Sequence, residues 1–191
     1  DQVVDHLPNC TVMMGVPTYY TRLLSNDRFG QTLTNNIRLF ISGSAPLLSE
    51  TFDEFLDRTG QSILERYGMT ETNMNTSNPL MGERRAGTVG LPLPGVDVRI
   101  VDQQGVDVSN GEIGDIQVRG DNVFKGYWRM PAKTAEDLHA DGFFNTGDKG
   151  TLSEDGYVSI VGRSKDVVIT GGLNVYPKEV ELIIDSLEGV K

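Results

Sequence analysis

The first eighty residues alternate short apolar runs with amphipathic segments, and this alternation restricts the fold more than any other feature of the chain. Residues 11–16 are interpreted as a buried strand that ends at Gly15, and residues 37–41 as a central strand. Ile63 and Leu64 begin a third apolar run. Strands that alternate with helices are typical of an α/β layer with a mostly parallel sheet. The predicted fold class is therefore α/β.

Two helical segments separate these strands. The first begins near Pro17, where a missing N–H costs nothing, and it leaves Arg22 off its apolar face. The second is capped by Ser49 and stopped by Gly60. The apolar positions expected to face the sheet are Tyr20, Leu23, Leu24, Phe52, Phe55 and Leu56.

Two polar segments follow the second and third predicted strands. Residues 42–46 form a small-residue turn where backbone could come close to a ligand. Residues 65–71, Glu-Arg-Tyr-Gly-Met-Thr-Glu, are interpreted as the end of a buried strand that opens into a loop. Residues 72–78 are amide-rich and lack any hydrophobic period, so they are expected to continue that loop without burial. Both segments fall at carboxyl ends of parallel strands, where such sheets bind ligands.

Residues 67–71 offer an aromatic ring, a glycine, a hydroxyl and a carboxylate. Such a set could stack a base, let backbone approach a phosphate, bond a phosphate oxygen and hold Mg²⁺. A strand end with a glycine turn and a solvated Glu71 is the structural alternative. These residues by themselves support both interpretations equally.

The pattern changes after residue 80. Residues 96–100 and 113–118 alternate as strands, and residues 152–161 predict a hairpin around an Asp-Gly turn. A short helix is expected over residues 132–138. The predicted organisation is the end of an α/β subdomain (1–80), a small antiparallel β-barrel-like subdomain (81–162), a hinge (163–166) and the start of an α+β domain (167–191).

Composition limits the partners. The net charge of −10 argues against nucleic acid or an anionic membrane as the main partner, and no apolar run approaches the roughly 18 residues of a membrane span. Cys10, the single cysteine, lies in an apolar run and is interpreted as a small buried hydrophobe of a reducing compartment. Bacterial cytoplasm and mitochondrial matrix are the two compartments expected.

Four motifs, in this order, resemble those of the adenylate-forming superfamily, which includes acyl-CoA synthetases, adenylation domains of peptide synthetases and luciferases. They lie at residues 67–71, 111–128, 146–148 and 162–166. The sequence around them, at residues 65–78 and 171–179, is most similar to malonyl-CoA synthetases.

The resemblance implies a role for each motif residue. Tyr67 would stack on adenine, Thr70 would bond the α-phosphate, and Glu71 would hold Mg²⁺. Lys165 would be the hinge about which a C-terminal domain rotates between half-reactions. Thr70, Glu71 and Lys165 are thus the expected catalytic residues. The other positions implied for ATP or CoA are Gly43, Ser44, Ala45, Pro46, Glu65, Gly68, Met69, Asp148, Arg163, Gly171 and Gly172.

Each of these roles has a structural alternative. Asp148, expected on the ribose hydroxyls, could cap its own turn, and Arg163, expected on the ribose or phosphate, could form a surface ion pair. Gly171 and Gly172, expected along the pantetheine of CoA, could serve only a hairpin bend. The acid pocket is expected at Ser44 and Met69. Arg22 is the candidate for a second substrate carboxylate, and a solvated helix arginine is its equal alternative.

The implied reaction joins a carboxylic acid to CoA through an acyl-adenylate, with ATP, Mg²⁺ and CoA, and malonate is the expected acid. Another acid, or an amino acid in an adenylation domain, is the first alternative. A non-catalytic β-rich binding module is the second. The family's phosphate loop and its adenylating lysine are expected upstream and downstream of these 191 residues, so the chain alone is expected to be inactive.

Overall fold

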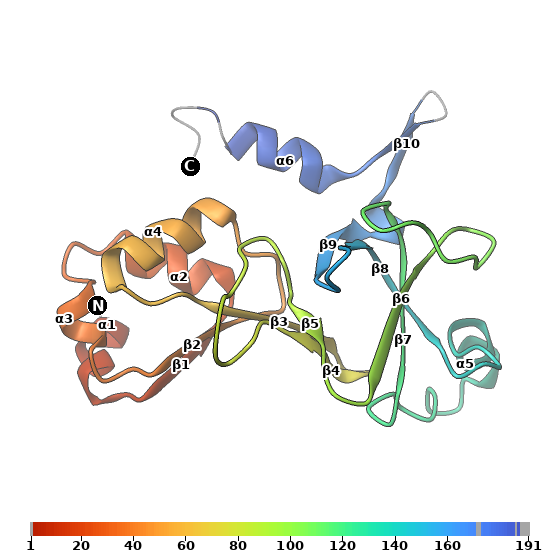
Figure 1. Ribbon diagram of the computed structural model, residues 1–191, viewed down its shortest axis with the longest axis horizontal. Coiled ribbons are helices and arrows are strands. Elements are labelled where there is room, and N and C mark those ends of the chain that lie inside the picture. The colour runs from red at the N-terminus through yellow and green to blue at the C-terminus, as the bar shows by residue number, and fades with distance from the viewer. Residues whose placement is uncertain (1, 171–172, 186, 188–191) are drawn as a thin grey trace. The chain divides into compact units, whose positions relative to one another are not determined.

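The computed structural model describes residues 2–170, 173–185 and 187 (Figure 1). It divides into two compact units, Asp1–Leu93 and Pro94–Lys191. Each unit has its own sheet, and each is treated by itself below.

In the first unit, short helices alternate with strands up to β3, as predicted. The described elements are α1 (Gln2–His6), η1 (Leu7–Asn9), β1 (Val12–Gly15), α2 (Pro17–Leu24), α3 (Gln31–Thr34), β2 (Leu39–Ser42), α4 (Ser49–Thr59), β3 (Leu64–Met69), β4 (Asn73–Ser77) and β5 (Leu91–Pro92).

The sheet of this unit has the order β1-β2-β3-β4-β5. Its first three strands are parallel, with Met14 opposite Ile41 and Ser42 opposite Glu65. The last two strands are antiparallel additions. The α/β layer is confirmed. The sheet is mixed because the chain reverses direction after β3, so that β4 pairs antiparallel with β3.

Helices α2 and α4 lie together on one face of the parallel strands (Figure 1), where their aromatic side chains form the core. The Phe55 ring meets Phe40 of β2 edge-on at 4.8 Å between ring centroids and Tyr20 of α2 at 5.5 Å. The Tyr20 hydroxyl donates a 2.6 Å hydrogen bond to the Ile41 carbonyl, which satisfies its polar tip within the core. Gly60 ends α4 in the left-handed conformation, as predicted.

Three details of the sequence interpretation are wrong. Strand β1, predicted to be buried, leaves Met14 63% exposed, because among the described residues it pairs on one side only, with β2. Leu56 is 39% exposed, because α4 turns this side of its stripe away from the core. Ser49 is the first helical residue, and Leu48, which lacks a capping side chain, precedes it.

The second unit is built on an antiparallel sheet of order β6-β7-β8-β9. Its described elements are β6 (Val96–Val101), β7 (Gly114–Gly120), α5 (Pro131–Asp137), β8 (Phe144–Leu152), β9 (Val158–Arg163), η2 (Ser164–Asp166), β10 (Val168–Thr170), β11 (Leu173–Val175) and α6 (Pro177–Asp185). The predicted hairpin forms between β8 and β9, with Ser153 N–H bonded to the Tyr157 carbonyl. Within the described residues this sheet is open, with β6 and β9 as its edges.

The final segment is a two-stranded hairpin, β10 and β11, followed by α6, which begins at Pro177 as predicted. The apolar stripe expected on this helix is solvent-exposed at Val180, Ile183, Ile184 and Leu187. Gly171 and Gly172, predicted to border CoA, lie outside the described residues. No helix in the described part of the chain has the length and apolar character to cross a membrane.

Candidate nucleotide and acid site

The carboxyl ends of the parallel strands meet at one edge of the first sheet. Gly15 ends β1 opposite Ser42, which ends β2, and Ser42 in turn lies opposite Glu65 on β3. Strand β3 runs on past this edge to Met69. The turn after β2 and the distal half of β3 are therefore neighbours, as the parallel arrangement predicted.

The turn at residues 43–46 carries backbone strain. Ser44 has φ 70°, a left-handed conformation that non-glycine residues seldom adopt and that often marks a ligand site. Gly43 is buried, whereas Ser44, Ala45 and Pro46 are exposed. The turn thus presents polar backbone and a hydroxyl to solvent beside the strand ends.

Arg66 is a functional candidate that the sequence interpretation missed. Its guanidinium lies against Gly43, where an added Cβ would be 2.7 Å from both Cζ and Nη1. Its Nη2 lies 3.8 Å from the Met14 sulfur. No carboxylate among the described residues forms an ion pair with it. A half-buried guanidinium thus lies at the strand ends, and no carboxylate of the described residues neutralises its charge.

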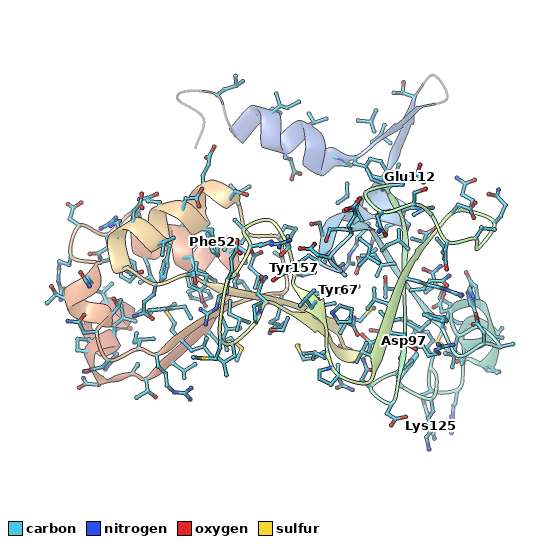
Figure 2. All side chains as sticks on the ribbon, viewed as in Figure 1. Phe52, Tyr67, Asp97, Glu112, Lys125 and Tyr157 are labelled. Atoms are coloured by element: carbon cyan, nitrogen blue, oxygen red, sulfur yellow. The ribbon has the colours of Figure 1, made fainter. Side chains whose placement is uncertain are left out.

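The motif at residues 65–71 is a β-hairpin arm, not a strand that dissolves into a loop. Residues 65–69 belong to β3, and residues 70–72 form the tight turn before β4. Asn73, at φ 52°, closes this turn in the left-handed conformation that short hairpin loops use. The turn places Thr70, which is exposed, and Glu71, which is half-buried, at the hairpin tip, while Tyr67 (Figure 2) is buried on the arm.

The amide-rich segment beyond this turn is buried, contrary to the sequence interpretation. Thr72, Asn75 and Thr76 are fully buried. Its backbone is paired with β3 and β5, and the ladder has a bulge at Asn75, whose carbonyl accepts a bond from Leu93 N–H. Hydrogen bonds hold this segment in place of apolar packing, and several of their partners lie ten or more residues away in the sequence.

Those partners form a loop that the hairpin supports. The Thr76 hydroxyl donates to the Val89 carbonyl at 2.7 Å, and the Asn78 amide donates to the Thr88 carbonyl at 2.8 Å. The Arg85 N–H donates to Asn78 Oδ1 at 3.0 Å. The polar residues of the segment therefore have a structural role that their composition did not reveal.

Glu65, predicted to contact the nucleotide, is 95% buried behind this hairpin. Burial raises the pKa of its carboxyl to about 7, and hydrogen bonds from the Leu47 and Gly87 backbone N–H groups oppose the shift without cancelling it. One carboxyl oxygen, Oε1, has no hydrogen-bond partner. Glu65 thus joins the loops after β2 and before β5 through hydrogen bonds from Leu47 and Gly87, and its contact with a nucleotide stays a prediction.

The raised pKa of Glu65 predicts that the chain loses stability as pH rises. Between pH 4.5, the ordinary pKa, and about pH 7, the folded state keeps a proton that the unfolded state releases. The free energy of unfolding should therefore fall by about 3 kcal/mol across this window relative to Glu65→Gln, which cannot ionise. Urea unfolding of both proteins at several pH values measures this difference. Parallel stability profiles for the two proteins would contradict it.

In the second unit, the local backbone fixes the position of Asp148. The Thr146 hydroxyl donates to the Ile116 carbonyl at 2.8 Å and accepts a bond from Asp148 N–H at 3.2 Å. Gly147 takes φ 74°, which glycine adopts without steric cost. The Thr-Gly-Asp sequence therefore holds a largely buried carboxylate in one place on β8.

Arg163 lies directly opposite Asp148 across the β8–β9 ladder, with Nε 3.5 Å from Asp148 Oδ1. The arginine side chain is 63% exposed, so this ion pair contributes at most about 1 kcal/mol to stability. Lys165, the predicted hinge, is exposed in η2 immediately after β9. The structure thus brings Asp148 and Arg163 together, with Lys165 two residues further along the chain.

The guanidinium of Arg22 does not lie at the strand ends. It is exposed in the last turn of α2, a helix that starts just after the carboxyl end of β1 and runs away from it. Met69, the other residue expected at the acid pocket, is half-buried at the end of β3. Of the two arginines, Arg66 is therefore the one whose guanidinium is placed at the strand ends.

Glu71, the residue predicted to hold Mg²⁺, lies at the hairpin tip. The described residues contain no group of three or more His, Cys, Asp or Glu side chains that could enclose a metal by itself. Mg²⁺ is usually bound by one or two carboxylates together with substrate phosphates and water. A single carboxylate such as Glu71, at the hairpin tip, fits that role.

Comparison with known proteins identifies relatives of this chain. An ATP-bound structure of MatB from Rhodopseudomonas palustris matches 99% of this chain and 38% of its own, with a TM-score of 0.96 and 57% identity. Malonate–CoA ligase of Arabidopsis thaliana is 43% identical over 180 residues, and a long-chain-fatty-acid–CoA ligase of Yersinia pestis is 39% identical over 175. The two alignments cover 90% and 91% of this chain but only 29% and 31% of those proteins.

These relatives are acid–CoA ligases, and this chain spans about a third of their length. The model of the AMP-binding enzyme family matches residues 6–128, which include both the strand-end turn and the hairpin. The chain belongs to the AMP-binding enzyme family, so the adenylate-forming resemblance is confirmed.

Proposed function

We propose that this chain supplies part of the active site of an ATP-dependent acid–CoA ligase whose acid is malonate. In the first half-reaction a malonate carboxylate oxygen attacks the α-phosphorus of ATP, a P–O bond breaks, and pyrophosphate leaves. In the second, the CoA thiolate attacks the acyl carbon, and AMP leaves with the bonding electrons. The products are malonyl-CoA, AMP and pyrophosphate.

The proposed residue roles rest on the family resemblance, and the local setting of each group supports them. Tyr67 offers a ring on the hairpin arm for adenine, and Thr70 offers a hydroxyl at the tip for the α-phosphate. Asp148 accepts the ribose hydroxyls, a role suited to a carboxylate that its own backbone holds fixed. Arg163, exposed beside Asp148, supplies positive charge to the ribose or phosphate. Gly68 and Met69 complete the arm, and residues 43–46 border the nucleotide and the acid.

Glu71 is the proposed protein ligand of Mg²⁺. When bound, the ion would offset negative charge on the phosphates of ATP. The contribution of the chain is to orient these groups before the reaction, which is how enzymes of this kind lower the barrier.

The single observation that favours malonate is the guanidinium of Arg66. A dicarboxylate places a second negative charge in the acid pocket, and that charge needs a cationic partner. Arg66 has a planar fork that matches a carboxylate in two places, and no acidic side chain of the described residues occupies it. A fatty or aromatic acid would leave this charge unpaired, which argues against the long-chain specificity of some relatives.

The test is to replace Arg66 by methionine in the complete ligase. Malonate-dependent ATP–pyrophosphate exchange should show a KM for malonate raised about 30-fold, because a charge-assisted hydrogen bond contributes about 2 kcal/mol. The KM for butyrate, which lacks the second carboxylate, should stay the same or fall. Arg22→Met is the matched control and should leave both values within about twofold. The assignment fails if Arg22→Met, and not Arg66→Met, strongly raises the KM for malonate. It also fails if Arg66→Met raises the KM for malonate and for butyrate equally.

A further inference from the structure

A three-residue contact in the second unit ties the sheet to the segment that contains Lys165. Asp115 Oδ1 lies 2.8 Å from Lys149 Nζ and accepts a 2.8 Å hydrogen bond from the Ser164 hydroxyl. The Asp115 and Lys149 side chains are only 18% and 16% exposed, so solvent competes little for this contact. The three residues come from β7, β8 and η2.

The strand register explains why these groups meet. Asp115 and Lys149 are direct partners across the β7–β8 ladder, and each borders a ladder irregularity of the kind that redirects side chains. Two consecutive residues of β8, Asp148 and Lys149, are thereby linked to two consecutive residues at the end of β9 and the start of η2, Arg163 and Ser164. Asp148 pairs with Arg163, and Lys149 acts through Asp115 on Ser164.

We propose that Asp115 is a positioning residue that fixes the stationary side of the hinge. With Ser164 bonded to the sheet, backbone rotation during a domain movement would be restricted to Lys165 and the residues after it. Asp148 and Arg163 would then keep their geometry toward the nucleotide while the following segment moves. This role rests on the proposed two-step ligase function, whereas the anchoring of Ser164 does not.

The sheet offers a matched control for this pair. Asp97 faces Arg119 across the β6–β7 ladder, and its Oδ2 lies 2.8 Å from Arg119 Nη2. This pair joins two strands as Asp115 and Lys149 do, but it does not touch η2. The Asp97–Arg119 pair is also more exposed, at 61% and 47%, so the comparison concerns η2 alone: if Asp115 served only strand pairing, neither Asp97→Asn nor Asp115→Asn would change the exchange of the η2 amides.

The first test is hydrogen–deuterium exchange in the 191-residue chain. Amides of residues 164–168 should exchange at least tenfold faster in Ser164→Ala, which leaves the Asp115–Lys149 pair intact, and in Asp115→Asn. Asp97→Asn should leave their exchange unchanged. Unchanged exchange in Ser164→Ala would overturn the anchor, even if Asp115→Asn folded poorly.

The second test measures the half-reactions separately in the complete ligase. Ser164→Ala should slow thioester formation from preformed acyl-adenylate about tenfold while ATP–pyrophosphate exchange changes less than twofold. Equal changes in both steps, or no change in either, would overturn the positioning role. If the wild-type ligase used no acid at all, the proposed function would fail while the exchange result on Ser164 still stood.

Discussion

Replacing Gly68 with alanine is expected to open the β3–β4 hairpin and to lower the free energy of unfolding by about 4 kcal/mol. A Cβ at this position would lie 1.9 Å from the Asn73 carbonyl oxygen and 2.9 Å from its carbon. Both are backbone atoms of the facing strand, so no side-chain rotation can relieve the contact, and the strands must separate. Urea unfolding of the 191-residue chain measures the loss.

Gly162→Ala is the matched control for this experiment. An added Cβ there meets nothing within 4 Å, so its effect on the unfolding free energy should stay within about 0.5 kcal/mol. In the complete ligase, Gly68→Ala should abolish ATP–pyrophosphate exchange, because Thr70 and Glu71 stand on the turn that this glycine permits. Wild-type stability in Gly68→Ala would show that the hairpin does not have this geometry.

The second large effect is expected from Asp148→Ala, which should raise the KM for ATP in the complete ligase by at least about 100-fold. A fixed carboxylate that accepts two ribose hydroxyls makes two charge-assisted hydrogen bonds, each equivalent to about 1.5–3 kcal/mol. Loss of the ion pair with Arg163 should by itself change the unfolding free energy by less than about 1 kcal/mol, since the Arg163 side chain is mostly exposed.

The KM for ATP and the unfolding free energy distinguish the two interpretations of Asp148. A carboxylate that merely capped its own turn would cost stability and leave nucleotide affinity unchanged. That outcome would favour the interpretation of the second unit as a non-catalytic β-rich module. Arg163→Met, measured beside it, should raise the KM for ATP by only about tenfold, because its exposed charge is screened by solvent.

Local patterns in the sequence were enough to predict the α/β layer. The apolar stripes of α2 and α4, the stop at Gly60 and the Asp-Gly turn between β8 and β9 all act within a few residues. The position of Asp148 could also be predicted from the sequence, because the adjacent residues Thr146 and Gly147 fix it.

Long-range partners account for what the sequence did not reveal. The strand at Asn73–Ser77 lacks a hydrophobic pattern because the groups that satisfy it lie at residues 88–93 and on β3. Arg66 has no local signal either, since its placement depends on Gly43 at the end of another strand. The available hint was that a small-residue turn and an arginine both follow predicted parallel strands, and the carboxyl ends of such strands meet.

The measurement that tests the central claim most directly is the acid specificity of the complete wild-type ligase. The kcat/KM for AMP-forming CoA thioester synthesis should be compared for malonate, acetate, butyrate, a long-chain fatty acid, ferulate and a panel of amino acids. We predict that malonate exceeds every monocarboxylate by at least about 100-fold, as expected when the half-buried guanidinium of Arg66 is left unpaired by the wrong acid. Preference for a long-chain or aromatic acid, or adenylation of an amino acid without any need for CoA, would contradict the account.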